Sequence, residues 1–160
     1  MPTSSPRTRG PTVKLESLPG YYIRRLQQIA VALYLQETEG LQLTAVQYAI
    51  LQSIHNQPSI DQRSLARSIG LDTSTLAGAV DRLEARGLLR RNTTPEDRRV
   101  RRLTITPEGS EVLLQAIPSI RRAQARMLAP LPPEERTEFM RMLRVLVNAN
   151  NEFSRAPSDG

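Results

Sequence analysis

Apolar residues recur three and four positions apart in three long stretches of the chain, at about 19–37, 107–128 and 134–151. This spacing places them on one face of an α-helix, so each stretch is predicted to be an amphipathic helix. Pro19 and Pro107 stand at first helical positions, where a missing backbone N–H is tolerated. The unit between these helices is too small to cover all three apolar faces. We therefore expect a dimer interface built from both ends of the chain, the alternative being that the helices pack only on each other.

Three shorter helices are predicted in the middle of the chain. In LTAVQYAILQSIHNQP, Thr44 and Gln47 have the spacing of a capping box at the start of a helix. The segment DQRSLARSIGLDTSTLAGAVDRLEARG holds two further helices, at about 61–69 and 72–86, joined by a tight turn at Gly70. This is the helix-turn-helix pattern, in which the second helix enters the major groove of DNA.

Two predicted strands, at about 88–93 and 100–105, follow directly and enclose the turn TPED. A helix-turn-helix followed by a hairpin is a winged helix. The predicted fold is therefore mainly α with a small β-wing, and N- and C-terminal helices form a dimerisation region. The predicted parts are a disordered basic tail at 1–17, helical dimerisation segments at 18–40 and 107–154, and a winged helix-turn-helix DNA-binding domain at 41–106.

The net charge of +6 is concentrated in residues 82–102, which contain eight arginines and three acidic residues. Six of these arginines fall within RRNTTPEDRRVRRLTITPEG, the predicted wing. Like charges crowded on a hairpin repel one another, and the planar guanidinium group suits phosphate. The wing is therefore predicted to meet nucleic acid, the alternative being an ordinary solvated face.

Several classes of protein are excluded by what the sequence lacks. There is no cysteine, which removes disulfides, thiolate metal sites and thiol redox sensing. His55 is the single histidine and no phosphate-binding glycine loop occurs, so we expect no metal, no cofactor and no enzymatic activity. No apolar run approaches the ~18 residues of a membrane span, and the start MPTSSPRTRGPTVK is not a secretory signal. We therefore expect a cytoplasmic, nucleoid-associated protein without membrane contact.

Three segments, LTAVQYAIL, LARSIGLDTSTLAGAVDRLEARGLLRR and DRRVRRLTITPEG, together resemble the MarR family of bacterial transcription regulators, over residues from about 20 to 150. The family's wing pattern is an aspartate, an arginine two residues on, and later a hydrophobe–threonine pair near a glycine. In this sequence these are Asp97, Arg99, Ile105, Thr106 and Gly109. The resemblance implies a dimer with two winged lobes, usually a repressor that releases DNA when a small molecule binds.

The residues expected to contact double-stranded DNA lie on the helix-turn-helix and the wing. In the family, the arginine at the position of Arg99 reaches into the minor groove, and the aspartate at Asp97 orients it. The first turn of the second helix offers short polar side chains to base edges or phosphates, unless these side chains only cap the helix. The expected DNA-binding residues are Arg63, Arg67, Thr73, Ser74, Thr75, Arg82, Asp97, Arg98, Arg99 and Arg101.

Two further features bear on how DNA would be contacted. Gly78 stands where relatives often have a long polar or basic residue, which argues against base recognition from the middle of the helix. The remaining arginines near the wing are expected to contact phosphates or to frame the wing, unless they form a solvated strand face. This group comprises Arg90, Arg91, Arg101 and Arg102.

Effectors in the family bind between the dimer helices and the winged lobe. Here that zone draws on YYIRRLQQIA and on the helix after Thr44, where arginine, tyrosine and histidine would suit an aromatic carboxylate. The segments RRLQQIA and QYAIL are similar to regulators of aromatic-acid breakdown, which implies a benzoate- or pyridine-type acid. Tyr48 and His55 are alternatively core or helix-end residues. The expected effector-binding residues are Tyr21, Arg24, Arg25, Gln28, Tyr48 and His55.

The sequence therefore predicts a homodimeric, ligand-responsive transcriptional regulator of aromatic compound catabolism. As a repressor it would bind a palindromic operator in double-stranded DNA and be released by a small aromatic acid. Two alternatives stay open. One is a winged-helix protein-interaction module whose arginines meet an acidic partner, and the other is a small-molecule-modifying enzyme that uses His55.

Overall fold

The computed structural model describes residues 12–93, 99–154 and 156. Within these residues the chain is mostly helical and has one two-stranded antiparallel sheet, which confirms the predicted fold class. The elements are η1 (Leu15–Ser17), α1 (Pro19–Glu37), α2 (Ala45–Asn56), α3 (Gln62–Ile69), α4 (Thr73–Ala85), β1 (Leu89–Thr93), β2 (Arg101–Ile105), α5 (Pro107–Leu128), α6 (Pro133–Ala149) and η2 (Asn151–Phe153).

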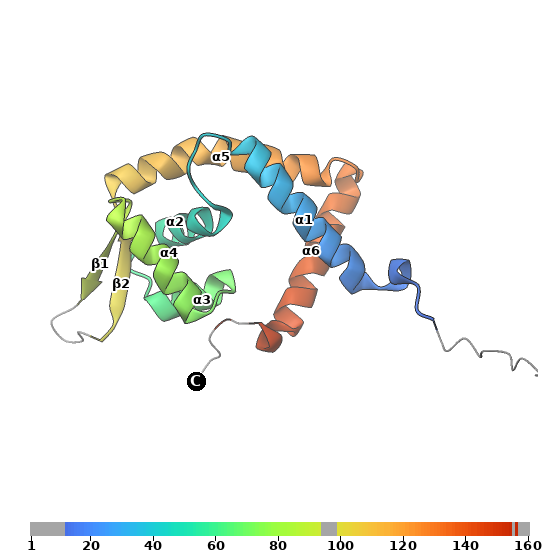
Figure 1. Ribbon diagram of the computed structural model, residues 1–160, viewed down its shortest axis with the longest axis horizontal. Coiled ribbons are helices and arrows are strands. Elements are labelled where there is room, and N and C mark those ends of the chain that lie inside the picture. The colour runs from blue at the N-terminus through green and yellow to red at the C-terminus, as the bar shows by residue number, and fades with distance from the viewer. Residues whose placement is uncertain (1–11, 94–98, 155, 157–160) are drawn as a thin grey trace, which may run out of the picture.

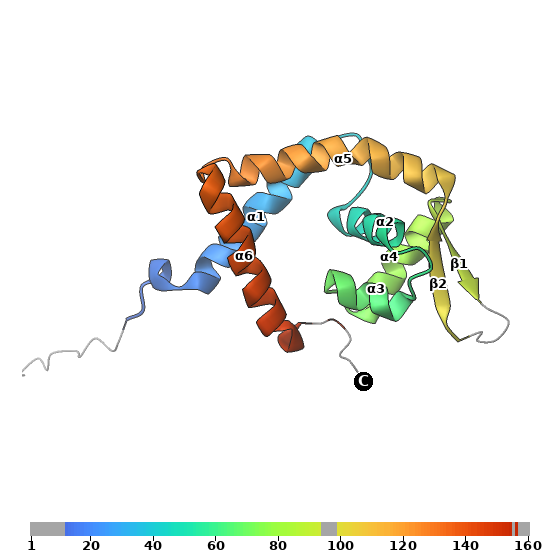
Figure 2. The same cartoon turned by 180° about the vertical axis from the view of Figure 1, so that it is seen from behind.

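The long helix α5 runs along one edge of the molecule and connects its two halves (Figure 1). At the start of α5 lies the winged lobe, residues 41–106, which contains α2, α3, α4, β1 and β2. At the other end α1 crosses and contacts α5, and α6 turns back from it, as the view from behind also shows (Figure 2). Of the helices in the segments expected to form a dimerisation region, α1 and α6 therefore lie away from the wing, whereas α5 begins at it.

The hydrophobic core lies mainly in the winged lobe and is built from aliphatic side chains. Each buried Leu, Ile or Val stabilises the fold by about 1.5–3 kcal/mol relative to an exposed position. Because the chain has only six aromatic residues, branched aliphatic residues from every element of the lobe fill this space. The largest fully buried side chains are Ile50, Leu51, Ile54, Leu65, Leu76, Val80, Leu83, Leu89, Leu103 and Leu113.

Helix starts in the lobe follow the capping residues that the sequence indicates. Thr44 and Gln47 form the reciprocal capping box at the start of α2. The carboxylates of Asp61 and Asp72 accept backbone N–H groups at the starts of α3 and α4. Gly70 ends α3 with a left-handed backbone of φ 71°, a conformation that glycine adopts without a steric penalty. These caps fix where the two helices of the helix-turn-helix begin and end.

The wing is joined to α5 by four residues, Gly87, Leu88, Thr106 and Gly109, which we call the wing–α5 joint. The Thr106 hydroxyl donates to the Gly87 carbonyl at 2.6 Å and accepts the Gly109 N–H at 3.0 Å. A Cβ at Gly109 would lie 1.9 Å from the Leu88 carbonyl oxygen, so only glycine fits there. The threonine and glycine of the predicted wing pattern therefore have a structural reason: they let α5 begin against the first wing strand.

The hairpin pairs Leu89 with Ile105 at its base and Thr93 with Arg101 at its outer end. The segment before α3 adds a short bridge to β2, because the Ser59 N–H donates to the Leu103 carbonyl and the Leu103 N–H donates to the Ile60 carbonyl. The turn of the wing, residues 94–98, lies outside the described residues. In the predicted basic tail, residues 1–11 also lie outside them, while 15–17 form η1.

An ion-pair cluster fastens the end of α1 to α5. Arg122 donates to one oxygen of the Glu37 carboxylate at 2.8 Å, and Arg126 donates to the other at 2.9 Å. The Glu37 side chain is only 16% exposed, so this cluster sits partly within the α1–α5 contact. The hydrogen bond from Arg122, followed by that from Arg126, holds the pKa of Glu37 below its ordinary value of 4.5.

We expect Glu37→Gln to lower thermal stability at neutral pH, because it removes the charge that both arginines meet. The lowered pKa means that the stabilisation is fully present above pH 4.5 and is lost as the pH falls through the folded-state pKa. The melting temperatures of parent and variant should therefore differ at pH 7 and converge in acid. Glu39→Gln is the matched control, since Glu39 is exposed in the next turn. A difference that stays constant down to pH 3 would contradict this account.

Candidate nucleic-acid interface

The start of α4 presents three short hydroxyl side chains, those of Thr73, Ser74 and Thr75, and all three are exposed. Thr75 is engaged in capping, because its hydroxyl and its N–H both donate to the Asp72 carboxylate at 2.7 Å. The hydroxyl bond from Thr75 is the main reason that the pKa of Asp72 is lowered, so the cap is charged at neutral pH. Thr73 and Ser74 thus remain as the side chains of this turn best placed to meet a ligand.

Gly78, in the middle of α4, borders open space. A Cβ there would meet only the tip of the Arg82 side chain, at 3.6 Å. The fold therefore does not require glycine at this position, although glycine inside a helix costs about 1 kcal/mol relative to alanine. The middle of α4 therefore presents no side chain at position 78, and the exposed Arg82 follows one turn further along.

The first turn of α3 and the second wing strand face each other across a polar hollow of about 710 Å³. Arg63 contributes from the helix, and Arg99, Arg101 and Arg102 contribute from the wing. Arg102 also donates to the Ser59 carbonyl at 3.1 Å, which ties the strand to the segment before α3. The helix-turn-helix and the wing thus bring their cations together around one hollow of the lobe. Arg63, Arg99 and Arg101 are among the residues that the sequence predicts to bind DNA, and that role stays a prediction.

Other predicted DNA-binding residues are distributed around this hollow or fall outside the described residues. Arg67 is half-buried in the last turn of α3, away from the hollow's lining. Arg90 is exposed on β1. Asp97 and Arg98 lie outside the described residues, so their expected roles stay predictions.

Arg91 behaves differently from its neighbours, because it points back into the lobe. Its guanidinium donates to Glu84 at 2.7 Å and also to Asp81, both on α4, while its Nε donates to Gln62 of α3 at 3.4 Å. Its side chain is only 16% exposed. Burial alone would lower the pKa of Arg91, but the hydrogen bonds that its guanidinium donates to Asp81 and Glu84 outweigh burial and raise that pKa. Of the two roles expected for Arg91, the structure assigns it the framing of the wing.

Sequence reasoning missed Asp81 and Glu84 as partners of the wing, although a signal for them existed. Alternate residues of a strand share a face, so Arg91 lies on the same side as the buried Leu89. The two acids stand three residues apart on α4, which places them on one helix face. An inward-facing arginine next to a helix with an acidic face predicts an ion pair.

The predicted effector residues do not converge on one cavity. Tyr21, Arg24, Arg25 and Gln28 all lie in the first half of α1, where Arg25 donates to the Tyr21 hydroxyl at 3.1 Å and stacks over its ring. Tyr48 and His55 lie on α2: the Tyr48 hydroxyl donates to Gln52 at 3.2 Å, and His55 is exposed. The structure therefore pairs Tyr21 with Arg25 and leaves the two α2 residues apart from them.

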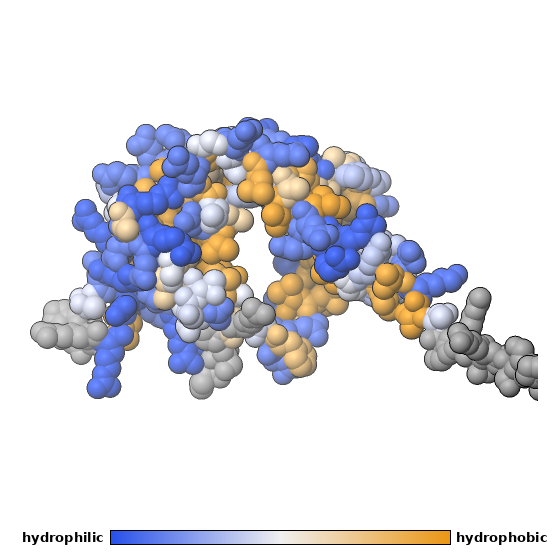
Figure 3. All heavy atoms as spheres, in the orientation of Figure 1, coloured by the Kyte–Doolittle hydropathy of each residue, from blue (hydrophilic) through white to orange (hydrophobic). Residues whose placement is uncertain are grey.

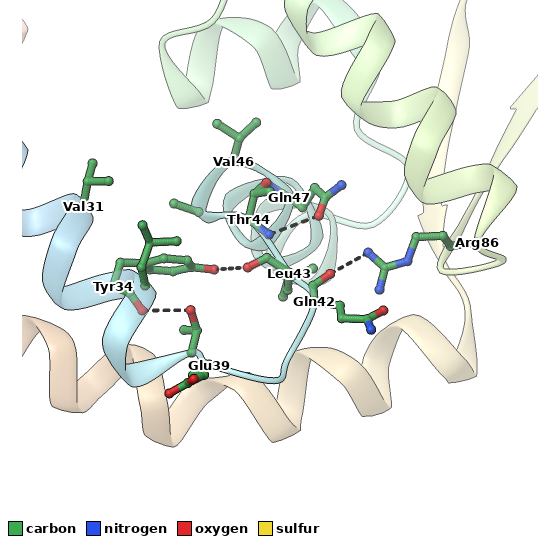
Figure 4. Close-up of a pocket in the computed structure, with 12 residues that line it drawn as sticks. Val31, Tyr34, Glu39, Gln42, Leu43, Thr44, Val46, Gln47 and Arg86 are labelled. Atoms are coloured by element: carbon green, nitrogen blue, oxygen red, sulfur yellow. Dashed lines mark hydrogen bonds between the residues drawn. The ribbon is translucent and has the colours of Figure 1, made fainter.

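A cavity of about 720 Å³ lies between the end of α1, the loop after it and the start of α2 (Figure 4). Its walls are mostly apolar and include Tyr34, whose hydroxyl donates to the Leu43 carbonyl at 2.6 Å. Arg86, which follows α4, reaches across and donates to the Gln42 carbonyl at 2.9 Å. None of the six predicted effector residues lines this cavity.

Apolar side chains are exposed along α1 and α6, and α6 buries no residue of its own. Figure 3 shows hydrophobic residues gathered on the sides of the two halves that border the central opening. Between α1 and α6 lies a hollow of about 490 Å³ lined by Tyr22, Ile23, Ile29, Met142 and Leu146 among others. Exposed apolar area of this extent on a helix pair is typical of a surface that binds another protein chain.

Across the described residues, no helix is long and apolar enough to cross a membrane. In the same part of the chain, no three His, Cys, Asp or Glu side chains are grouped so that they would hold a metal ion.

Comparison with known proteins places this winged lobe in a family. The model of the MarR family matches residues 43–100, a range that contains α2, α3, α4 and β1 and ends just before β2. The transcriptional regulator HosA of Escherichia coli O111:H- is 35% identical over 129 residues, which cover 81% of this chain and 94% of HosA. The chain belongs to the MarR family. Proteins of the MarR family are transcriptional regulators and not enzymes, which confirms the sequence prediction and removes the enzymatic role for His55.

Two solved structures of regulators are similar to this MarR family chain over nearly their whole length. PcaV of Streptomyces coelicolor, solved in complex with its natural ligand, has a TM-score of 0.81 at 36% identity. The match covers 87% of this chain and 98% of PcaV. BpsR of Bordetella bronchiseptica, whose DNA binding is regulated by 6-hydroxynicotinic acid, has a TM-score of 0.81 at 27% identity. The match covers 85% of this chain and 97% of BpsR.

Proposed function

We propose that this MarR family protein is a dimeric repressor that binds a palindromic operator in double-stranded DNA and releases it when a small aromatic acid binds. The observation that carries the DNA-binding part is the polar hollow where Arg63 of α3 meets the arginines of β2. Phosphates on one backbone strand would be met there by both the helix-turn-helix and the wing. The start of α4, with Thr73 and Ser74, would then face the major groove.

The proposed dimer is supported by the apolar surface of α1 and α6. A second copy would cover Met142 and Leu146 and the facing side of α1, which water otherwise contacts. Two lobes related by a two-fold axis would meet half-sites roughly 10 bp apart, so the operator would be palindromic. The alternative, a winged-helix module for an acidic protein partner, requires no such half-sites.

Arg99→Ala is expected to weaken DNA binding at least tenfold, because it removes a cation at the end of the wing. The loss of one phosphate or groove contact should lower the slope of log affinity against log salt by about 0.9. Affinity is measured by fluorescence anisotropy on a duplex that the parent protein selects from a random-sequence pool.

Arg121→Ala is the matched control, since Arg121 is an exposed arginine on α5 far from the wing in sequence. Equal binding by Arg99→Ala and the parent would show that the wing does not contact DNA. If the parent selects no duplex even at low salt, the protein-interaction alternative is favoured.

Leu146→Arg is expected to convert the dimer to a monomer, because it places a charge in the apolar hollow between α1 and α6. Asn148→Arg, also exposed and two residues along α6, should leave the dimer intact. Sedimentation velocity over a range of protein concentrations gives the oligomeric state of both variants. A Leu146→Arg protein that sediments like the parent would rule out this surface as the dimer interface.

The proposed effector is a small aromatic acid, and Arg25 is its proposed carboxylate partner. The guanidinium of Arg25 donates to the hydroxyl of Tyr21 and lies over the ring of the same tyrosine. A cation beside an aromatic ring and a hydroxyl suits a ligand that carries a carboxylate on an aromatic ring. BpsR, whose DNA binding is regulated by 6-hydroxynicotinic acid, supports an effector of this class. PcaV, which was solved in complex with its natural ligand, supports a regulator that responds to a ligand.

A panel of benzoic and pyridine carboxylic acids, 6-hydroxynicotinic acid included, tests this assignment by thermal shift. Binding stabilises the folded state by about 2.7 kcal/mol when the acid is present at one hundred times its Kd. We expect Arg25→Gln to abolish the shift and Arg86→Gln to keep it. The reverse outcome would place the acid in the cavity of Figure 4, and no shift with any acid would contradict the effector class.

A further inference from the structure

Arg91 lies on the first wing strand, and its guanidinium forms ion pairs with two of the protein's own acids, Asp81 and Glu84. Its side-chain hydrogen bonds reach two different helices: those to Asp81 and Glu84 reach α4, and the one to Gln62 reaches α3. In addition, the Arg91 backbone N–H donates to Glu84 at 3.0 Å. The Glu84 carboxylate therefore holds β1 by its backbone and its side chain together.

This cluster cannot be explained as a source of positive charge for DNA. The two acids carry two negative charges and Arg91 carries one positive charge, so the cluster is net negative. It lies on the helix whose first turn is proposed to enter the major groove. Acidic groups on a helix that binds DNA repel the phosphates and oppose binding, so their presence calls for another role.

We propose that Asp81 and Glu84 are positioning residues that set the angle between the wing and α4 through Arg91. This inference rests on the proposed DNA binding. A helix in the major groove and a wing in the neighbouring minor groove must be held at one mutual orientation. The hydrogen bond from the Arg91 backbone to Glu84 and the guanidinium bonds to α4 hold β1 in that orientation. The bond from Arg91 to Gln62 connects the strand to α3 as well.

The proposal makes a prediction opposite in sign to simple electrostatics. Removing an acid from a DNA-binding surface normally strengthens binding, because it removes repulsion from the phosphates. Glu84→Ala is instead expected to weaken binding about 5- to 20-fold, since coupling energies within such clusters correspond to changes of this size. Asp81→Ala should act in the same direction and more weakly, because the Asp81 side chain is 65% exposed and makes no backbone bond to β1.

Binding is measured on the duplex that the parent selects from a random pool, with circular dichroism melting and sedimentation as checks on fold and dimer. Glu108→Ala is the control: it removes an exposed acid at the start of α5 and should leave binding unchanged or slightly tighter. Arg91→Ala should weaken binding without lowering the salt slope, whereas Arg99→Ala lowers it by about 0.9. The double variant Glu84→Ala with Arg91→Ala should bind DNA about as tightly as the weaker-binding single variant, because both substitutions break the same contact.

A readout that needs no DNA accompanies these measurements. In folded Glu84→Ala protein, hydrogen exchange of the β1 amides should quicken, while exchange in α2 stays as in the parent. Glu84→Ala binding as tightly as the parent, or tighter, overturns the proposal, as does unchanged exchange in β1. If the parent protein selects no duplex, the proposed function itself is overturned. This outcome is seen before any variant is made, so it cannot be confused with failure of the positioning role.

Discussion

The whole arrangement depends on the close contact at the wing–α5 joint. The start of α5 touches the Leu88 backbone so closely that a single carbon on Gly109 would overlap the Leu88 carbonyl oxygen. Thr106 completes the joint, because one hydroxyl both caps α5 and bonds to Gly87. Since α5 then runs to the far half of the molecule and contacts α1 there, this joint fixes where the wing stands relative to the helices proposed to bind a second copy.

Arginine serves two different purposes in this chain, and its partners decide which. Arg122 and Arg126 meet Glu37 and fasten α1 to α5, and Arg91 meets two acids of α4. On the wing's second strand, by contrast, Arg101 and Arg102 lie exposed beside the first turn of α3. A count of arginines along the sequence therefore overstates the charge that the protein offers to a polyanion.

Local signals allowed the helices and strands to be predicted, because each is decided by neighbours in sequence. The capping box at Thr44 and the glycine turn at Gly70 both depend on residues at most a few positions away. The roles of Arg91 and the effector residues depend on contacts between elements. Strand alternation shows which way Arg91 faces, but only the packing of β1 on α4 supplies its acids. Likewise Tyr48 suits an aromatic acid by type, yet on α2 its hydroxyl bonds to Gln52.

The energetic scale of the Arg91 cluster explains why it would matter for recognition more than for folding. Ion pairs with a partner as exposed as Asp81 contribute about 0–1 kcal/mol each to stability, far less than the aliphatic core beneath them. Yet β1 is an edge strand of a two-stranded sheet, and such a ribbon has little intrinsic stability or stiffness of its own. Bonds too weak to decide whether the lobe folds are strong enough to decide the angle at which a ribbon leaves it, and that angle determines whether wing and helix reach neighbouring grooves together.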